Sequence, residues 1–248
     1  MSVSSDRIRQ LNQRPPRAGG FVLYWMQQAQ RAQWNDALEY AAAQANERAL
    51  PLVVCFGLTS YPEANVRHYT FMLEGLIETA EALKKRRIQF VLQLGDPAEV
   101  ALKIGRRAAV IVCDRGYLRI QKQWRATLVQ KAQCAVLQVE CDVIVPVEVA
   151  SEKQEFAART LRPKLIRVFE DYLAQPKAIR LKKSSLGLRL GGEEVKLALL
   201  RRLDLDESVP PVTRFFRGGT SEAEKIFRRF LRTKFVDYRE HRNQPQTS

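Results

Sequence analysis

The sequence predicts an α/β fold in which five parallel strands form a doubly wound, Rossmann-like sheet, followed by a helical extension at the C-terminus. Two observations lead to this prediction. Five short apolar runs alternate with longer segments of helical spacing between residues 21 and 139. The runs are continuously apolar, as expected for strands whose two faces are both covered by helices. Right-handed crossovers between such strands give an open wound sheet.

The expected strands and helices follow one another in a regular order. Gly57 and Gly95 close the second and third apolar runs, and Asp96 followed by Pro97 suits the start of a helix. Apolar residues between 64 and 87 recur at intervals of three and four, which places them on one helix face. We therefore expect strands at Phe21–Met26, Leu52–Phe56, Ile88–Leu94, Ala109–Cys113 and Ala135–Val139, and helices at Trp34–Arg48, Ala64–Arg87, after Asp96 and at Tyr117–Lys131.

The segments outside this repeating pattern differ from it in composition. Residues 1–20 are polar and end in prolines and glycines, which predicts a flexible leader before an α/β domain at 21–175. Residues 176–217 are polar and rich in lysine and glycine, which predicts a mobile linker that contains a short helix. Residues 218–248 are predicted to contain a last helix, one face of which carries several aromatic side chains. Such a face indicates docking on the α/β domain or on a partner.

Composition restricts the class of protein. Hydrophobic residues make up 46% of the chain, enough for a packed core, and no apolar run is long enough to span a bilayer. The N-terminal residues lack the apolar stretch of a secretion signal, so we expect a cytoplasmic protein without membrane contact. The four cysteines form no CxxC pair and are expected to be buried free thiols. With two histidines, a histidine-rich metal site is not expected.

The net charge of +14 is unevenly distributed. Residues 177–248 carry 17 basic and 9 acidic side chains, whereas the longer stretch before them carries 24 and 18. A basic excess of this size indicates contact with a polyanion such as DNA. The alternative is that lysine and arginine only keep the surface soluble.

Two segments carry the candidate ligand-binding residues, because ligands of wound sheets bind at the carboxyl ends of the strands. Aromatic rings beside one acid and one arginine suit a planar, partly anionic ring ligand. The alternative is that the aromatic residues belong to the core and that the acid and arginine form a solvated turn. The usual phosphate-loop, dinucleotide, zinc-protease and hydrolase motifs are absent from the sequence. The candidates follow the first and fourth strands and are Tyr24, Trp25, Met26, Asp114, Arg115 and Tyr117.

Seven segments between about residues 20 and 175 carry a family resemblance through their common order and spacing. They are Val22–Arg31, Asn35–Tyr40, Pro62–Tyr69, Phe71–Leu76, Asp114–Arg119, Val143–Glu148 and Thr160–Lys164. Together they resemble the N-terminal domain of the class II cyclobutane pyrimidine dimer photolyases, more closely the microbial members than the animal ones. Residues 218–245 are similar to the opening helix of that family's helical domain.

The resemblance implies the antenna and scaffold half of a light-dependent DNA repair lyase. In the family this domain often holds an antenna chromophore of the deazaflavin or folate type, whose pocket the six candidate residues would line. Flavin adenine dinucleotide (FAD) and the dimer-binding pocket belong to residues that follow this point in the family, so FAD is expected only in a missing domain. The resemblance assigns no catalytic residue to this chain, which alone is expected to be inactive in repair. Damaged DNA and a second polypeptide with the flavin domain are the implied partners.

Three other interpretations are compatible with the sequence. The chain is a stand-alone module that binds a chromophore or nucleotide, a basic DNA-binding fragment, or the truncated product of a longer gene. Blue or near-ultraviolet absorption that co-purifies with the protein favours the first. DNA affinity that falls steeply with salt favours the second, and a continuing flavin domain in the downstream gene sequence favours the third.

Overall fold

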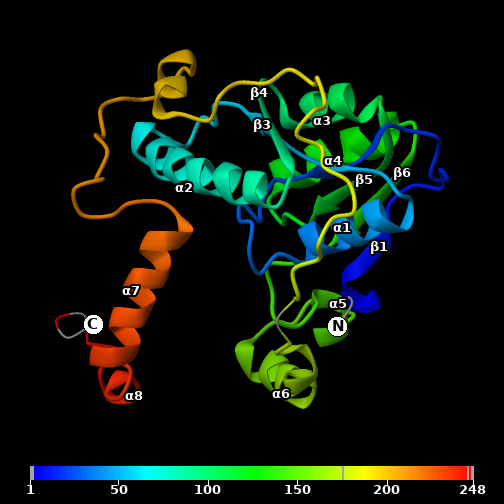
Figure 1. Ribbon diagram of the computed structural model, residues 1–248. Helices are drawn as coiled ribbons and strands as arrows, with labels where there is room; N and C mark the ends of the chain where they lie inside the picture. Colours follow the sequence, from blue (N-terminus) through cyan, green and yellow to red (C-terminus); the bar gives the residue numbers. More distant parts are fainter. Residues whose placement is uncertain (1–2, 175, 245, 247–248) are drawn as a thin grey trace. The chain divides into compact units, whose positions relative to one another are not determined.

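A computed structural model of the chain describes residues 3–174, 176–244 and 246 (Figure 1). Its strands are β1 (Ile8–Gln10), β2 (Phe21–Trp25), β3 (Leu52–Leu58), β4 (Gln89–Leu94), β5 (Ala108–Asp114) and β6 (Ala135–Val139). Its α-helices are α1 (Asp36–Glu47), α2 (Val66–Lys85), α3 (Pro97–Gly105), α4 (Arg119–Lys131), α5 (Val147–Ala150), α6 (Ala158–Val168), α7 (Thr220–Thr233) and α8 (Tyr238–His241). Short 3-10 helices lie at Ser5–Arg7, Glu170–Tyr172 and Leu197–Arg202.

The strands form one sheet in the order β1-β6-β5-β2-β3-β4. Strands β2 to β6 are parallel, and β1 pairs with β6 in the antiparallel direction. The α/β fold with a wound parallel sheet is therefore confirmed. The expected number of strands was wrong, because the sheet has six strands rather than five.

Helices cover both faces of this sheet, which explains why strands β2 to β6 are mostly apolar rather than alternating in polarity. One face of β2 packs into a buried core with α3 and α4, through Phe21, Leu23 and Trp25. The alternate residues Val22 and Tyr24 are buried as well, on the face that α1 covers (Figure 1). Every residue of β2, β3, β5 and β6 is buried.

The expectation of a flexible leader over residues 1–20 is wrong for its described part. Ile8 pairs with Val139 and Gln10 with Leu137, so β1 covers the edge of the sheet that β6 would otherwise expose. The strand has three residues, of which one is apolar. It is too short and too polar to produce the pattern from which the other strands were predicted.

Arg7, which precedes β1, ties this terminus to the loop after β6. It is 8% exposed, and its guanidinium donates hydrogen bonds to the carbonyls of Glu140, Val143 and Ile144. We expect Arg7→Met to lower the free energy of unfolding by about 2–3 kcal/mol, because it removes charged donors from buried carbonyls. Urea denaturation measures this change. The exposed neighbour Arg9, replaced by methionine, is the control and is expected to change stability by less than about 0.5 kcal/mol. Equal effects of the two substitutions would contradict the anchoring role of Arg7.

The segment 176–194, expected to be part of a mobile linker, lies along the opposite edge of the sheet. The Glu193 amide donates to the Leu92 carbonyl at 2.8 Å, and the Ser185 hydroxyl accepts from the Gln89 amide at 2.7 Å. Ser185 is fully buried. These contacts use backbone atoms and one small polar side chain, so no apolar pattern marks them in the sequence.

The chain divides into two compact units that differ from the expected domains. The α/β unit contains residues 1–59 and 80–194, and the C-terminal unit contains 60–79 and 195–248. The C-terminal unit is held together by bonds between distant segments. The Val66 amide donates to the Asp206 carbonyl at 3.0 Å, and the Gly218 amide donates to a Glu74 carboxylate oxygen at 2.7 Å. The boundary predicted between residues 175 and 176 rests on local composition, which cannot show that distant segments pair with each other.

The α7 helix starts at a close contact within the C-terminal unit. A Cβ atom on Gly218 would lie 1.9 Å from the Phe71 carbonyl oxygen, and Gly219 has a φ of +117°. These positions therefore require glycine. Along α7 and after it, Phe227, Phe235 and Tyr238 remain substantially exposed. No helix in the described part of the chain combines the length and apolarity needed to cross a bilayer.

Candidate functional site

The strand order places the expected crevice between β2 and β5. The chain passes from β2 to β3 on one side and returns later to β5 on the other side, so the order reverses at this point. Asp114 is the last residue of β5, and residues 26–35 form the loop that follows β2. The carboxyl ends of these two strands therefore flank the position at which a wound sheet binds its ligand.

Asp114 fills this position with its own carboxylate. Its Oδ2 atom accepts hydrogen bonds from the backbone amides of Gln27, Gln28 and Ala29 at 3.0–3.1 Å and from the Tyr24 hydroxyl at 3.1 Å. Asp114 is fully buried. Amides that an anionic ligand would otherwise use are thus occupied by the chain itself. Asp114 is not part of a solvated turn.

Burial controls the protonation of this pair. It raises the pKa of Asp114, while the amides of Ala29, Gln27 and Gln28 act in the opposite direction. Burial, and then the charge of Asp114, raise the pKa of Tyr24 well above its usual value, so Tyr24 remains a neutral donor. Asn35 completes the network, because its Nδ2 donates to the Tyr24 oxygen at 3.1 Å and its Oδ1 accepts from the Leu38 amide to cap α1.

The predicted site residues in and directly after β2 belong to the core. Tyr24, Trp25 and Met26 have almost no exposed surface, so they offer no face on which a ring could stack. The alternative of core residues therefore describes Tyr24 and Trp25. Among the six candidates, Arg115 and Tyr117 keep exposed surface near the carboxyl edge, and their contact with a ligand stays a prediction.

Arg115 and Tyr117 form the edge cluster together with Glu140 and Glu148. The two terminal nitrogens of Arg115 donate to the two carboxylate oxygens of Glu148 at 2.5 and 2.7 Å, which is bidentate geometry. The Arg115 guanidinium lies 5.4 Å from the centre of the Tyr117 ring, and the Tyr117 hydroxyl donates to Glu140. The bond from Arg115 lowers the pKa of Glu148, whereas burial raises that of Tyr117.

An apolar groove of about 550 Å³, called the edge groove below, adjoins this cluster. Val147 connects the groove with the cluster. It lines the groove, its backbone amide donates to the Glu140 carboxylate at 3.1 Å, and it directly precedes Glu148 in the sequence. This volume lies within the range of pockets that bind drug-sized ligands. The loop after β6, α5, α6 and the residues around them supply the lining, which is Val143, Ile144, Val145, Val147, Ala150, Ser151, Lys153, Gln154, Glu155, Leu161, Leu165 and Phe169.

Gln27 is a candidate that the sequence did not single out. It is 8% exposed, and neither atom of its side-chain amide has a hydrogen-bond partner among the described residues. A buried amide without partners is costly, so a ligand that supplies an acceptor and a donor would satisfy it. A deazaflavin or pteridine ring has such an edge, and the residues at this end of the sheet therefore fit that class of ligand.

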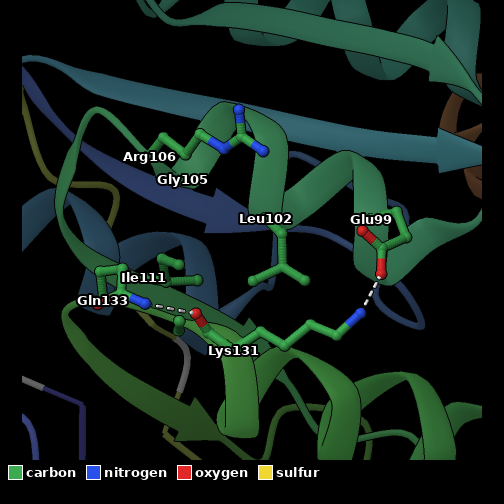
Figure 2. A pocket seen from close by; sticks show the side chains of 8 residues that line it. Glu99, Leu102, Gly105, Arg106, Ile111, Lys131 and Gln133 are labelled. Atoms are coloured by element: carbon green, nitrogen blue, oxygen red, sulfur yellow. Dashed lines mark hydrogen bonds and ion pairs between the residues drawn. The ribbon is translucent and has the colours of Figure 1, made fainter.

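A second, smaller hollow lies between α3 and α4, near the amino-terminal ends of the strands (Figure 2). Its volume is about 240 Å³, and Leu102 and Ile111 are among its lining residues. The Lys131 ammonium reaches the Glu99 carboxylate across it at 2.7 Å. This is the amino edge of β5 and β6, where wound sheets do not hold their ligands. Within the described residues, no group of three or more acidic, histidine or cysteine side chains is arranged to hold a metal ion.

Comparison with known proteins identifies relatives over most of the chain. A family model described as DNA photolyase matches residues 22–181. The deoxyribodipyrimidine photo-lyase of Methanothermobacter thermautotrophicus is 42% identical over 245 residues, which cover 98% of this chain and 54% of that protein. That of Potorous tridactylus is 34% identical over 239 residues, which cover 90% of this chain and 42% of that protein. The chain thus spans about half the length of these relatives.

Solved structures show the same fold at low sequence identity. A class III photolyase from Agrobacterium tumefaciens superposes with a TM-score of 0.68 at 16% identity, and covers 92% of this chain and 48% of that one. A Synechocystis cryptochrome gives a TM-score of 0.65, also at 16% identity, and covers 90% and 49%.

Proposed function

Because the chain belongs to the DNA photolyase family, we propose that its α/β unit holds an antenna chromophore at the carboxyl edge of the sheet. The observation on which this proposal depends is the apolar edge groove beside the edge cluster, at the same edge as the unsatisfied amide of Gln27. The ligand class is a planar fused ring of the deazaflavin or folate type. When bound, such a ring absorbs light and passes the excitation to a flavin.

The groove offers apolar contact with a few polar groups, as sites for ring ligands generally do. Ile144, Leu165 and Phe169 supply apolar surface for the faces of a ring. Lys153, also at the groove, supplies a positive charge for an anionic substituent or tail. Gln27 does not line the groove but follows β2 at the same end of the sheet, and a ligand that extends from the groove to its unpartnered amide would satisfy one donor and one acceptor there.

Three of the predicted residues, Tyr24, Asp114 and Arg115, also hold parts of this site in position. Asp114 fixes the loop from which Gln27 projects by accepting from the loop's backbone amides, and the Tyr24 hydroxyl donates to the same Asp114 carboxylate. Arg115 fixes α5, and with it one part of the groove, by its bidentate contact with Glu148.

DNA repair is the activity that we propose for this chain in combination with a flavin-binding domain or subunit. Reversal of a pyrimidine dimer requires an electron from a reduced, excited flavin and a dimer flipped into a pocket. As the resemblance implies, a further domain or a second polypeptide would supply both. We assign no catalytic residue to the α/β unit and propose that it also acts as a scaffold.

Ligand binding tests the proposal. We expect the purified chain to bind an 8-hydroxydeazaflavin or a methenylfolate saturably, observed as a shift in ligand absorption and fluorescence. Ile144→Glu places a charge in the apolar groove and is expected to weaken this binding more than about tenfold, equivalent to about 1.4 kcal/mol. Ile166→Glu is the matched control, since Ile166 is exposed on α6 outside the groove lining. We expect it to leave the affinity unchanged.

A second variant separates ligand binding from stability. Gln27→Leu removes an amide without partners, so we expect unchanged or slightly higher stability together with weaker ligand binding. Failure of the unaltered chain to bind either probe would disprove the proposal. Equal effects of the Ile144 and Ile166 substitutions would instead place the ligand away from the edge groove.

A further inference from the structure

We propose that the C-terminal unit carries a groove that binds the phosphodiester backbone of DNA through Arg214, Arg217, Lys225, Arg229 and Arg232. This inference goes beyond the proposed chromophore site, which lies in the α/β unit. It rests on the proposed role in DNA repair solely for the choice of DNA as the polyanion.

The groove has two walls that the sequence places close to each other. Thr213, Arg214, Phe215 and Arg217 form one wall, in the segment just before α7. The other wall is a single face of α7, because its lining residues recur at intervals of three and four. They are Glu222, Lys225, Ile226, Arg229 and Arg232. The hollow between the walls has a volume of about 550 Å³.

The lining is strongly basic. Five basic side chains share the groove with one acid, Glu222, which lies 3.4 Å from the Lys225 ammonium. Outside the groove lining, Arg228 of α7 pairs with Glu224 at 3.0 Å, so one acid balances one base there. Like charges gathered in one concave surface repel one another, which opposes folding, and they focus a positive potential on that surface.

The chemistry of the lining favours a phosphate backbone over other anions. Four of the five basic residues are arginines, whose planar donors match phosphate oxygens in pairs. Phe215 lines the same groove and is 77% exposed, so it offers an open ring on which a base can stack where a strand is unpaired. The surface is hollow, which suits a strand of nucleic acid better than the broad surface of an anionic membrane.

Salt-dependent DNA binding tests the proposal. The full chain is titrated into a fluorescein-labelled DNA duplex at salt concentrations between about 50 and 200 mM, and the affinity is read by anisotropy. Removing two phosphate contacts with Arg229→Gln and Arg232→Gln is expected to reduce the slope of log affinity against log salt by about 1.8. At about 0.1 M salt we expect the double variant to bind at least roughly tenfold more weakly.

The matched control removes the same charge elsewhere. Arg228→Gln with Arg239→Gln alters two arginines outside the groove lining, and we expect a nearly unchanged slope and an affinity within about threefold. Melting curves of both variants verify folding. If the Arg229 and Arg232 variant does not fold, Arg214→Gln tests the other wall and is expected to reduce the slope by about 0.9.

Three results would overturn the inference. They are an absence of DNA binding by the unaltered chain, equal loss in both double variants, and binding to phosphatidylserine vesicles without binding to DNA. Chromophore binding, measured on the same preparations, reports on the proposed function separately. Groove-dependent DNA affinity without chromophore binding would support this inference and contradict that function.

Discussion

Replacing Asp114 with alanine is expected to lower the free energy of unfolding by about 4 kcal/mol or more, which approaches the whole stability of many domains. The substitution leaves the Tyr24 hydroxyl and three backbone amides of the loop after β2 buried without an acceptor. Each unsatisfied group costs about 1–3 kcal/mol. Chemical denaturation measures the change, and chromophore binding is expected to be lost with the loop geometry.

A carboxylate with a similar bonding role but a different environment provides the control. The Asp96 Oδ1 atom also accepts from two backbone amides, those of Ala98 and Glu99, at 2.8 and 3.0 Å. Asp96 is exposed, so water replaces the lost acceptor, and Asp96→Ala is expected to cost about 1 kcal/mol. A loss at Asp114 no larger than that at Asp96 would contradict the account of a carboxylate that fills the crevice.

Arg86→Ala is expected to cost about 3–5 kcal/mol, because it leaves the buried carboxylate of Glu39 without its counter-ion. Two nitrogens of Arg86 reach the two oxygens of Glu39 at 2.7 and 2.8 Å, and Glu39 is nearly inaccessible to solvent. Glu39 also accepts from the Ile179 amide at 2.7 Å. The pair therefore attaches the segment that covers the edge of β4 to α1.

A double-mutant cycle tests this pair. Replacing both Arg86 and Glu39 by alanine is expected to cost less than the sum of the single substitutions, because no charge remains buried alone. Lys131→Ala serves as the control, since the ion pair of Lys131 with Glu99 is solvent-exposed on both sides (Figure 2). It is expected to change stability by less than about 1 kcal/mol. Additive losses at Arg86 and Glu39 would rule out the coupling.

The parts of the fold that were predictable from sequence are those built from local apolar patterns. Strands β2 to β6 coincide with mostly apolar runs of the sequence. Asp96 caps the N-terminus of α3, and Pro97 is the first residue of that helix, as the sequence predicts. By contrast, β1 and the segment around Ser185 are held by backbone hydrogen bonds. The association of residues 60–79 with the C-terminal unit depends on contacts such as that of Glu74 with Gly218, which no local pattern encodes.

The candidate site was predictable in position but not in detail. Strand ends pointed to Tyr24 and Asp114, and both lie at the carboxyl edge of the sheet. The sequence does not show that the carboxylate of one strand fills the crevice beside the next, because this depends on the path of the loop. The edge groove was missed for a related reason. Its lining from α6 includes Leu161 and Leu165, whose spacing in the sequence does not distinguish a groove wall from a packed helix face.

The two covered edges of the sheet limit how another chain can associate with the α/β unit. Strand β1 pairs along β6, and the segment at Ser185 and Glu193 bonds to β4. Among the described residues, an incoming polypeptide therefore finds β6 and β4 already paired or covered, and the outermost strand on the first side is β1, which has three residues. Such a short strand offers little backbone for β-augmentation. A separate flavin-bearing subunit would therefore recognise this unit mainly through side chains on its helices and loops. Such an interface depends on shape and can be disrupted by single surface substitutions.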